Sequence, residues 1–237
     1  MKSIYHRAES RGGQNHGWLK TKHSFSFANF HDPKKMNFGA LRVLNDDFVA
    51  PGMGFGMHSH ANMEIITIPM AGELHHKDSM GNSGSIKSGE IQIMSAGTGI
   101  QHSEFNGSKE HPVSFFQIWI NPNKLNVEPR YDQFKISDFS KSNEFQQIIS
   151  PSKTDEGVWI QQNSWFNILK TTQKTTRKYN LHKEENGVYI FVISGSANIN
   201  GQTLNSRDAL GIWEVQDFEI EAEENAEILL IEVPMAI

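Results

Sequence analysis

The decisive stretches of the chain are GMHSHANMEIITI (residues 56–68) and QIMSAGTGIQHSEF (residues 92–105). His58 and His60 lie two residues apart in the first stretch, and His102 and Glu104 lie two residues apart in the second. On a β-strand this spacing places both side chains on one face. Two such strands brought together aim three imidazoles and one carboxylate at a common point. The sequence therefore predicts a β fold with a transition-metal site.

The donor set narrows the chemistry of this site. Imidazole and carboxylate ligands without thiolate suit Fe(II), Mn, Co, Ni, Cu(II) or Zn. Four protein ligands leave one or two open positions on a five- or six-coordinate metal, where a substrate or O2 can bind. Ordinary structural histidines are the alternative. A second pair at the same spacing, beside a glycine-rich turn, favours the metal site.

Composition excludes several classes of protein. A net charge of −5 and a pI near 6.1 argue against a nucleic-acid surface. The chain has no Cys, which excludes disulfides and thiol chemistry and fits a reducing cytoplasm. The N-terminal residues have no apolar core of a secretory signal, and no apolar run approaches the roughly 18 residues of a membrane span. We expect a cytoplasmic protein that binds neither nucleic acid nor membrane.

Hydrophobic periodicity is mostly two, which is typical of strands. The expected strands are HSFSF (23–27), EIQIM (90–94), VSFFQIWI (113–120), VYIFVI (188–193) and AEILLIEV (226–233). Turn residues recur about every 8–12 residues, which favours a β-sandwich or barrel. The polar stretch 121–157 reads as a connection, with one short helix expected at 138–149.

The second half of the chain weakly repeats the first. EIITIPMAGEL (64–74) aligns with GVYIFVISGSA (187–197) when Gly72 is placed on Gly195, an offset of 123 residues. This repeat predicts two tandem barrels, which we assign to residues 1–137 and 138–237. At that offset His58 and His60 align with Leu181 and Lys183, and no His follows His182. The metal site is therefore expected in the first barrel alone.

The motifs resemble those of a known superfamily. The pattern G-x5-H-x-H-x3-E from Gly52 to Glu64 resembles the first cupin motif, and Gly89–Asn106 resembles the second. More narrowly, the chain is similar to the pirin family of bicupins, in the stretches GWLKTKHSFSFANFHDP (17–33), MHSHANMEI (57–65), AGELHHKDSMGNSG (71–84) and QIMSAGTGIQHSEFN (92–106). The match covers residues 5–125 well and the second half loosely. Ser59, Ala61 and Ser95 depart from the residues common at their positions.

The resemblance implies an all-β bicupin whose metal, most often Fe(II), is held by His58, His60, His102 and Glu104. One carboxylate is ambiguous, because cupins in general use the residue at Glu64 as a ligand. Glu64 also shares strand parity with His58 and His60 and is expected to face inward. We favour Glu104 as the ligand. Glu64 then supports a ligand imidazole or forms an internal hydrogen bond, since a buried carboxylate needs a partner.

The resemblance also implies an activity. Some pirins are quercetin 2,3-dioxygenases, in which O2 opens the heterocyclic ring of a flavonol and carbon monoxide is released. Glu104 would then be both metal ligand and general base for the flavonol hydroxyl. Two alternatives remain, a metal-dependent regulator that binds a protein partner and a bicupin that acts on another small molecule. The expected partners are a small aromatic substrate and O2, and a monomer is expected.

Other residues have simpler interpretations. Phe25 and Phe27 are expected to share one face in the core, although they could line an aromatic pocket. Phe55 and Met57, next to the first ligands, are expected to line the barrel. The residues His75, His76 and Asp78 could form a second metal site, but a hairpin with polar caps is favoured. The remaining histidines of the first 111 residues are expected to be structural or at the surface: His6, His16, His23, His31 and His111.

Overall fold

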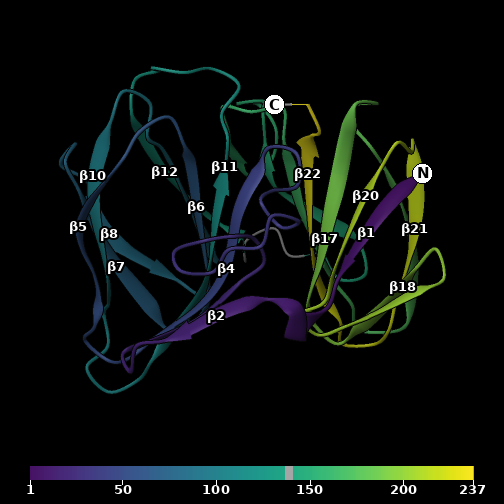
Figure 1. Cartoon of the computed structure of the whole chain (residues 1–237), viewed down its shortest axis with the longest axis horizontal. Helices are drawn as coiled ribbons and strands as arrows, with labels where there is room; N and C mark the ends of the chain where they lie inside the picture. The colour runs from purple at the N-terminus through teal and green to yellow at the C-terminus, as the bar shows by residue number, and fades with distance from the viewer. Residues whose placement is uncertain (137–140, 237) are drawn as a thin grey trace.

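The computed structural model describes residues 1–136 and 141–236. The protein is built from four antiparallel-rich sheets that form two barrels side by side (Figure 1). Within the described residues there is one 3-10 turn, Ala8–Ser10, and no α-helix, and none of the helical structure could cross a membrane. The prediction of an all-β fold with two tandem barrels is confirmed.

The first barrel consists of a seven-stranded and a four-stranded sheet that face each other. The seven-stranded sheet has the order β12 (Arg130–Lys135), β9 (Glu90–Ser95), β6 (Glu64–Ala71), β11 (Val113–Ile120), β4 (Leu41–Val49), β3 (Leu19–His23) and β2 (Gly12–Asn15). The four-stranded sheet has the order β5 (Gly54–His60), β10 (Ile100–Asn106), β7 (Glu73–Asp78) and β8 (Ser83–Lys87).

The second barrel repeats this arrangement. Its seven-stranded sheet has the order β1 (Lys2–His6), β20 (Ala209–Trp213), β17 (Asn186–Ser194), β22 (Glu227–Pro234), β15 (Trp165–Lys170), β13 (Phe145–Ser150) and β14 (Val158–Trp159). Its four-stranded sheet has the order β16 (Thr175–Asn180), β21 (Asp217–Ala222), β18 (Ser196–Ile199) and β19 (Gln202–Asn205). The amino-terminal strand β1 thus belongs to the second barrel, as Figure 1 shows. The boundary assigned at residues 137 and 138 falls outside the described residues and stays a prediction.

The largest hydrophobic core lies between the two seven-stranded sheets. Phe116 and Ile118 of β11 pack in one cluster with Phe191 of β17 and Ile231 of β22, so the two barrels share this core. The alternation along β11 explains the arrangement, because successive side chains of a strand point to opposite faces. Even-numbered residues of β11 enter the shared core, and the odd-numbered ones turn to the interior of the first barrel.

Two local predictions are wrong. The helix expected at 138–149 is contradicted where the chain is described, since Phe145–Ser150 forms β13 and pairs with β15; residues 137–140 lie outside the described residues. The apolar residues at 145, 148 and 149 fit a helical spacing as well as a strand. The segment forms a strand because it pairs with the edge of β15 that β22 leaves open. The strand expected at 23–27 ends at His23. Phe25 therefore joins the shared core, whereas Phe27 lies over the cavity of the first barrel.

An ionic cluster fastens the two barrels together. Asp46 of β4 accepts hydrogen bonds from Arg11, at 3.3 Å, and from Arg207 of the second barrel, at 2.8 Å. The Arg207 guanidinium also lies over the ring of Phe116 of the first barrel. The side chains of Arg11 and Asp46 are 6% and 18% exposed. The side chain of Arg207 is 32% exposed, so removing the carboxylate would leave one buried and one half-buried cation close together, which is costly.

We expect Asp46→Ala to lower the free energy of unfolding by about 3 kcal/mol, because it breaks a buried ion pair. Urea unfolding monitored by tryptophan fluorescence measures this change. Asp217→Ala is the control, since Asp217 pairs with Lys178 at 3.1 Å on the exposed surface, and we expect a loss below about 0.5 kcal/mol there. Equal losses in the two variants would show that the cluster contributes no more than a surface pair.

Candidate metal centre

Three imidazoles meet inside the first barrel. His58 and His60 lie on β5, and His102 lies on β10 directly opposite His58 in the antiparallel register. One ring nitrogen from each of the three lies within 4.8 Å of the others, and among the described residues no other group of His, Asp or Glu meets this criterion. The sequence spacing therefore brings together three of the four predicted ligands as expected.

A β-bulge shapes the first ligand strand. The register between β5 and β10 shifts between the pairs His102↔His58 and Glu104↔Phe55, so β5 contains one extra residue. This shift turns Phe55 toward the cavity and leaves Met57 54% exposed, so the expectation that Met57 lines the barrel is wrong. Gly54 is required in the same stretch, because a Cβ there would collide with the backbone oxygen of Glu104.

The bulge also orients one imidazole. The Nδ1 of His58 lies 2.8 Å from the backbone oxygen of Gly56, which has only lone pairs to offer. Nδ1 of His58 must therefore carry the proton and donate it, and Nε2 presents its lone pair. In metal-binding histidines, the tautomer is commonly fixed by a hydrogen bond from the ring nitrogen that does not bind the metal.

The other two imidazoles have buried nitrogens without partners in the described structure. These are Nε2 of His60 and both ring nitrogens of His102. Burial lowers the pKa of His60 to about 4 and that of His102 to about 3, and the neighbouring imidazoles add to both shifts. The rings are therefore neutral. Unpaired lone pairs in a buried site are costly, and a divalent transition-metal ion would satisfy them.

Glu104 lies at the same cavity but outside the imidazole group. It shares the inward face of β10 with His102 and is 3% exposed. Its Oε1 accepts a hydrogen bond from the Thr67 hydroxyl at 3.2 Å. Burial raises the pKa of Glu104 to about 7; the Thr67 hydrogen bond opposes this shift and the charge of Asp47 adds to it. The role of Glu104 as the fourth ligand stays a prediction.

Thr67 couples Glu104 to a second side chain. Its hydroxyl oxygen also lies 3.1 Å from Oε1 of Gln117, yet a hydroxyl carries only one proton to donate. When Oε1 of Glu104 is protonated, it can donate a hydrogen bond to the Thr67 hydroxyl oxygen. The Thr67 hydroxyl then donates its own hydrogen bond to Oε1 of Gln117. When Glu104 is ionised, it accepts the hydrogen bond from the Thr67 hydroxyl. Gln117 can then form a hydrogen bond with Thr67 only if its amide nitrogen is turned toward the Thr67 oxygen.

The expectation that Glu64 faces the ligands is wrong. A turn at Ala61–Met63, with Asn62 at φ 51°, ends β5, and Glu64 starts β6 in the opposite sheet. Its Oε2 accepts hydrogen bonds from Ser95 Oγ of the neighbouring strand β9, at 2.8 Å, and from the backbone N–H of Gln161 in the second half of the chain, at 3.2 Å. The alternative of an internal hydrogen bond is therefore confirmed. Strand parity failed here because it does not survive a change of sheet.

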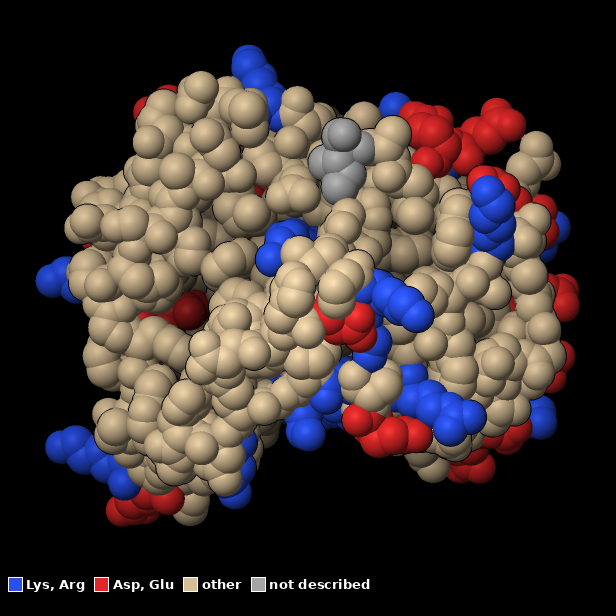
Figure 2. Space-filling view, viewed as in Figure 1, with Lys and Arg blue, Asp and Glu red and all other residues tan. Residues whose placement is uncertain are grey.

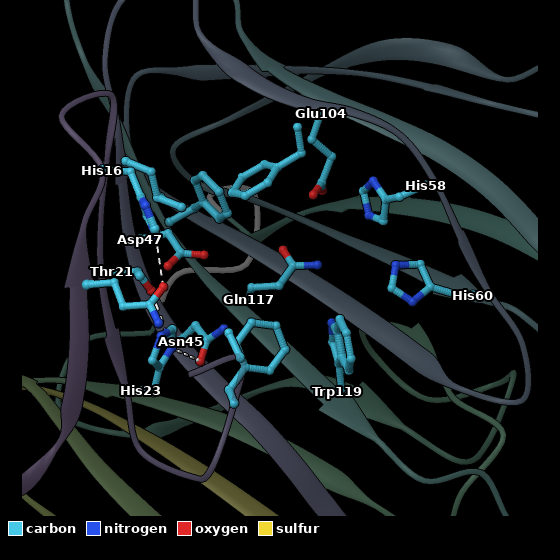
Figure 3. Close-up of a pocket in the computed structure, with 16 residues that line it drawn as sticks. His16, Thr21, His23, Asn45, Asp47, His58, His60, Glu104, Gln117 and Trp119 are labelled. Atoms are coloured by element: carbon cyan, nitrogen blue, oxygen red, sulfur yellow. Dashed lines mark hydrogen bonds between the residues drawn. The ribbon is translucent and has the colours of Figure 1, made fainter. Parts of the chain in front are cut away.

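A cavity of about 340 Å³ leads to the imidazoles. Figure 2 shows a hollow in the half of the molecule that contains the first barrel, with acidic atoms visible at its floor, and the acidic residues that line the cavity are Asp47 and Glu104. In Figure 3, His58 and His60 lie on one side and Thr21, His23 and Asp47 on the other. The full lining is Gln14, His16, Leu19, Thr21, His23, Phe27, Ala28, Asn45, Asp47, Phe55, His58, His60, Glu104, Phe115, Gln117 and Trp119.

Several of these residues escaped the sequence analysis. His16 and His23 were interpreted as structural or surface residues, and both line the cavity. The usable signal was alternation: Leu19, Thr21 and His23 are inward on β3 while the lysines between them are exposed. On β11 the inward residues include Gln117 and Trp119. Alternation shows the face of a strand but not which inward residues surround a cavity.

The other candidate histidines form a hairpin. Asp78 caps the turn between β7 and β8 by accepting from the backbone N–H groups of Met80 and Asn82, both at 2.9 Å. His75 pairs with Glu73 at 2.7 Å, and His76 stacks on Tyr131. These residues are not among the potential metal ligands that the described structure groups together. The hairpin with polar caps is therefore the correct interpretation.

The interior of the second barrel differs from that of the first. A cluster that includes Val188, Ile190 and Leu230 fills it. The cross-strand pair Val188↔Glu232 stands where the first barrel has Ile65↔Trp119. Glu232 is fully buried and accepts hydrogen bonds from Tyr179, His182 and Asn186 at 2.8–2.9 Å. This carboxylate is satisfied by the protein itself. That the second barrel binds no metal stays a prediction.

Comparison with known proteins agrees with this site. A family model described as Pirin matches residues 5–120, and one described as Quercetinase C-terminal cupin domain matches residues 147–233. The chain is 42% identical to a protein named Quercetin 2,3-dioxygenase from Escherichia coli (strain K12), over 96% of this chain and 97% of that protein. It is 40% identical to a Pirin-like protein from Caulobacter vibrioides, over 93% of this chain and 95% of that one.

The chain belongs to the pirin family. The crystal structure of the bacterial pirin YhhW from Escherichia coli in complex with nickel(II) has a TM-score of 0.93 to this pirin, with 38% identity and full coverage of both chains. The resemblance drawn from the motifs is thereby confirmed. A relative with this fold binds a divalent metal, in agreement with the imidazole cluster of this pirin.

We expect His102→Ala to weaken the binding of a divalent metal at least about a hundredfold, because it removes one of the three expected imidazole ligands, and even outer partners of ligands are worth about 10–100-fold. Elemental analysis after dialysis measures the bound ion. His75→Ala is the control, since its exposed imidazole contacts Glu73 and lies away from the cavity. Full metal content in His102→Ala would locate the ion elsewhere.

Proposed function

We propose that this pirin is a metal-dependent dioxygenase that opens the heterocyclic ring of a flavonol such as quercetin with O2. The names of its relatives support the proposal, since several are quercetin 2,3-dioxygenases or putative ones. The observation that carries it is the cavity, which joins His58 and His60 of the imidazole group to an aromatic wall. Such a pocket is the usual form of a small-molecule site.

The aromatic wall fits a flat substrate. Trp119 stands beside the cluster, with its ring centroid 4.9 Å from that of His60, and Phe27 meets it edge-on at 5.4 Å. Phe55 and Phe115 complete the apolar surface. A planar ring packed against Trp119 would have its edge next to the imidazoles. An open cavity of this kind favours an enzyme over the alternative of a closed, regulatory metal site.

We assign one divalent metal to His58, His60 and His102, with Glu104 as the fourth ligand, and Fe(II) as the native ion. The donor set also accepts Mn, Co, Ni, Cu or Zn. A bound ion would act as a Lewis acid toward the flavonol hydroxyl and as a template for the substrate and O2. The protein supplies the orientation of the imidazoles and the exclusion of bulk water.

Glu104 is the group we assign to proton transfer. Its Oε1 contacts Thr67, which leaves Oε2 free to take the proton of the flavonol 3-hydroxyl. Oε1 keeps its hydrogen bond from Thr67, whose hydroxyl also contacts Gln117, so these two residues hold the carboxyl group in place during the transfer. The same carboxylic acid can return the proton to the ring-opened product.

Two further predictions accompany this function, a cytoplasmic location and a monomer, and a protein partner is expected only under the regulatory alternative. Size-exclusion chromatography with light scattering measures the second of them.

Turnover tests the proposal directly. Protein loaded separately with Fe(II), Ni(II), Mn(II) and Co(II) is mixed with quercetin under O2, and the loss of flavonol absorbance and the release of carbon monoxide are followed. We expect both with at least one metal, and neither with the metal-free protein. If every metal form leaves quercetin intact, the chain acts on another molecule or in regulation.

Glu104→Gln should lower kcat at least about a hundredfold, because it removes the proton acceptor while keeping the shape of the side chain. Bound metal, measured by elemental analysis, should stay substantial because three imidazoles remain. Glu64→Gln is the matched control, since Glu64 is a buried carboxylate of the same barrel that points away from the site. More than a trace of dioxygenase activity in Glu104→Gln would rule out the base role.

A further inference from the structure

The cavity has a second polar end that the proposed chemistry does not use. Thr21 and His23 of β3 pair across the strands with Asp47 and Asn45 of β4. All four side chains line the cavity. Figure 3 shows them on the side away from His58 and His60, with Gln117 between the two groups. The cavity is therefore polar at both ends and aromatic between them.

Two of these side chains satisfy each other. The Nδ1 of His23 lies 2.8 Å from Oδ1 of Asn45, so the ring donates to the amide oxygen. Burial lowers the pKa of His23, which keeps the ring neutral. Nε2 of His23 is then a hydrogen-bond acceptor, and it is buried without a partner in the described structure.

Asp47 is the unexplained member of the set. It is 5% exposed, and its Oδ1 is buried without a hydrogen-bond partner in the described structure. None of the described residues that line the cavity is Lys or Arg, so no cation compensates this carboxylate from within the pocket. A buried carboxylate oxygen without a partner is costly to folding. Asp47 also lies outside the imidazole group, so a metal in that group does not explain it.

We propose that Asp47 is a specificity-determining residue, whose unpaired oxygen accepts a hydrogen bond from a hydroxyl on the end of the aromatic substrate that lies away from the metal. The inference rests on the proposed function, because it concerns the substrate of that site. His23 Nε2 offers a second acceptor at the same end. Two acceptors select a ring that carries hydroxyl donors, and they disfavour a ring that carries a carboxylate or a methoxy group there.

The expected effect of the distal hydroxyl on affinity follows from the cost of leaving the Asp47 oxygen without a hydrogen-bond donor. A site built to bind a hydroxyl loses more from its absence than an apolar pocket loses from a missing methylene. Burial raises the pKa of Asp47 to about 7, and a hydrogen bond from Thr21 opposes that shift. A hydroxyl donor from the substrate favours the ionised carboxylate, to which hydrogen bonds are stronger than to a neutral group. We expect the hydroxyl on the distal ring to improve kcat/KM and the dissociation constant by about ten- to a hundredfold in the wild-type protein.

The test combines two variants with three flavonols whose pendant ring carries no, one or two hydroxyls. For metal-loaded wild type, Asp47→Ala and Asp47→Asn, kcat/KM is measured under O2 and the dissociation constant is measured without O2 by quenching of tryptophan fluorescence. We expect Asp47→Ala to bind the hydroxylated flavonols about ten- to a hundredfold more weakly and the unhydroxylated one within about threefold of wild type. Asp47→Asn, which keeps one acceptor oxygen, should lie between.

Gln14→Ala is the control, since Gln14 lines the cavity from β2, opposite Thr21 in the register, but its Oε1 already contacts His16 Nε2 at 2.8 Å. It should change all three affinities by the same factor. The thermal midpoint separates recognition from a structural role. Asp47 has one unpaired oxygen and one hydrogen bond with Thr21, so its removal should not lower the midpoint of Asp47→Ala by more than about 5 °C. A fall of more than about 5 °C would show that Asp47 supports the fold and would overturn the proposal.

The two proposals fail differently. Equal weakening of all three flavonols by Asp47→Ala, with turnover retained in the wild type, overturns the role of Asp47 and leaves the dioxygenase function intact. Discrimination in binding without turnover by any metal form overturns the function and supports the role of Asp47. If none of the flavonols binds the wild type, both proposals are wrong.

Discussion

The packing of the two seven-stranded sheets against each other is the interaction on which the rest of the structure depends. It buries large side chains such as Phe116, Phe166, Tyr189 and Phe191 in one continuous cluster. Burial of apolar area is the dominant favourable contribution to folding. The outer face of the first seven-stranded sheet already buries apolar side chains in this core. The inner face of the same sheet therefore does not need to be fully packed with apolar side chains. The first barrel can therefore keep a cavity with polar walls.

The interiors of the two barrels show the consequence. In the second barrel, one cluster of aliphatic and aromatic side chains fills the space between the sheets, and the buried Glu232 has its own donors. In the first barrel, the apolar interior is split into two small clusters, one around Leu74 and Phe115 and one around Ile65 and Met94. The remaining volume is the cavity that ends at the imidazoles. The second barrel thus has a filled interior, and the first contains the cavity and the imidazole group.

Among the described residues, buried polar atoms without hydrogen-bond partners are concentrated in the first barrel, and several of them lie at the two ends of its cavity. The imidazole nitrogens of His60 and His102 lie at one end of the cavity, and Oδ1 of Asp47 lies among the polar residues at the other end. Each would destabilise a sealed core, since burial of an unsatisfied polar atom is unfavourable. A metal ion at one end would take one lone pair from each imidazole, and a hydroxylated ring reaching the other end would donate to Asp47. The stability of the shared core offsets the cost while the site is free.

The sequence by itself determined the all-β class, the tandem repeat and the two ligand strands, because periodicity of two and the spacing of His58, His60 and His102 are local properties of a strand. It also pointed to the hairpin around Asp78, since turn residues act over a few neighbours. Only the tertiary structure decided which sheet received Glu64, whether 145–149 became helix or strand, and that Thr21, Asn45 and Asp47 meet across a cavity. Those outcomes depend on strand partners far away in the chain, and local patterns carry no information about which distant edge or face a segment will find.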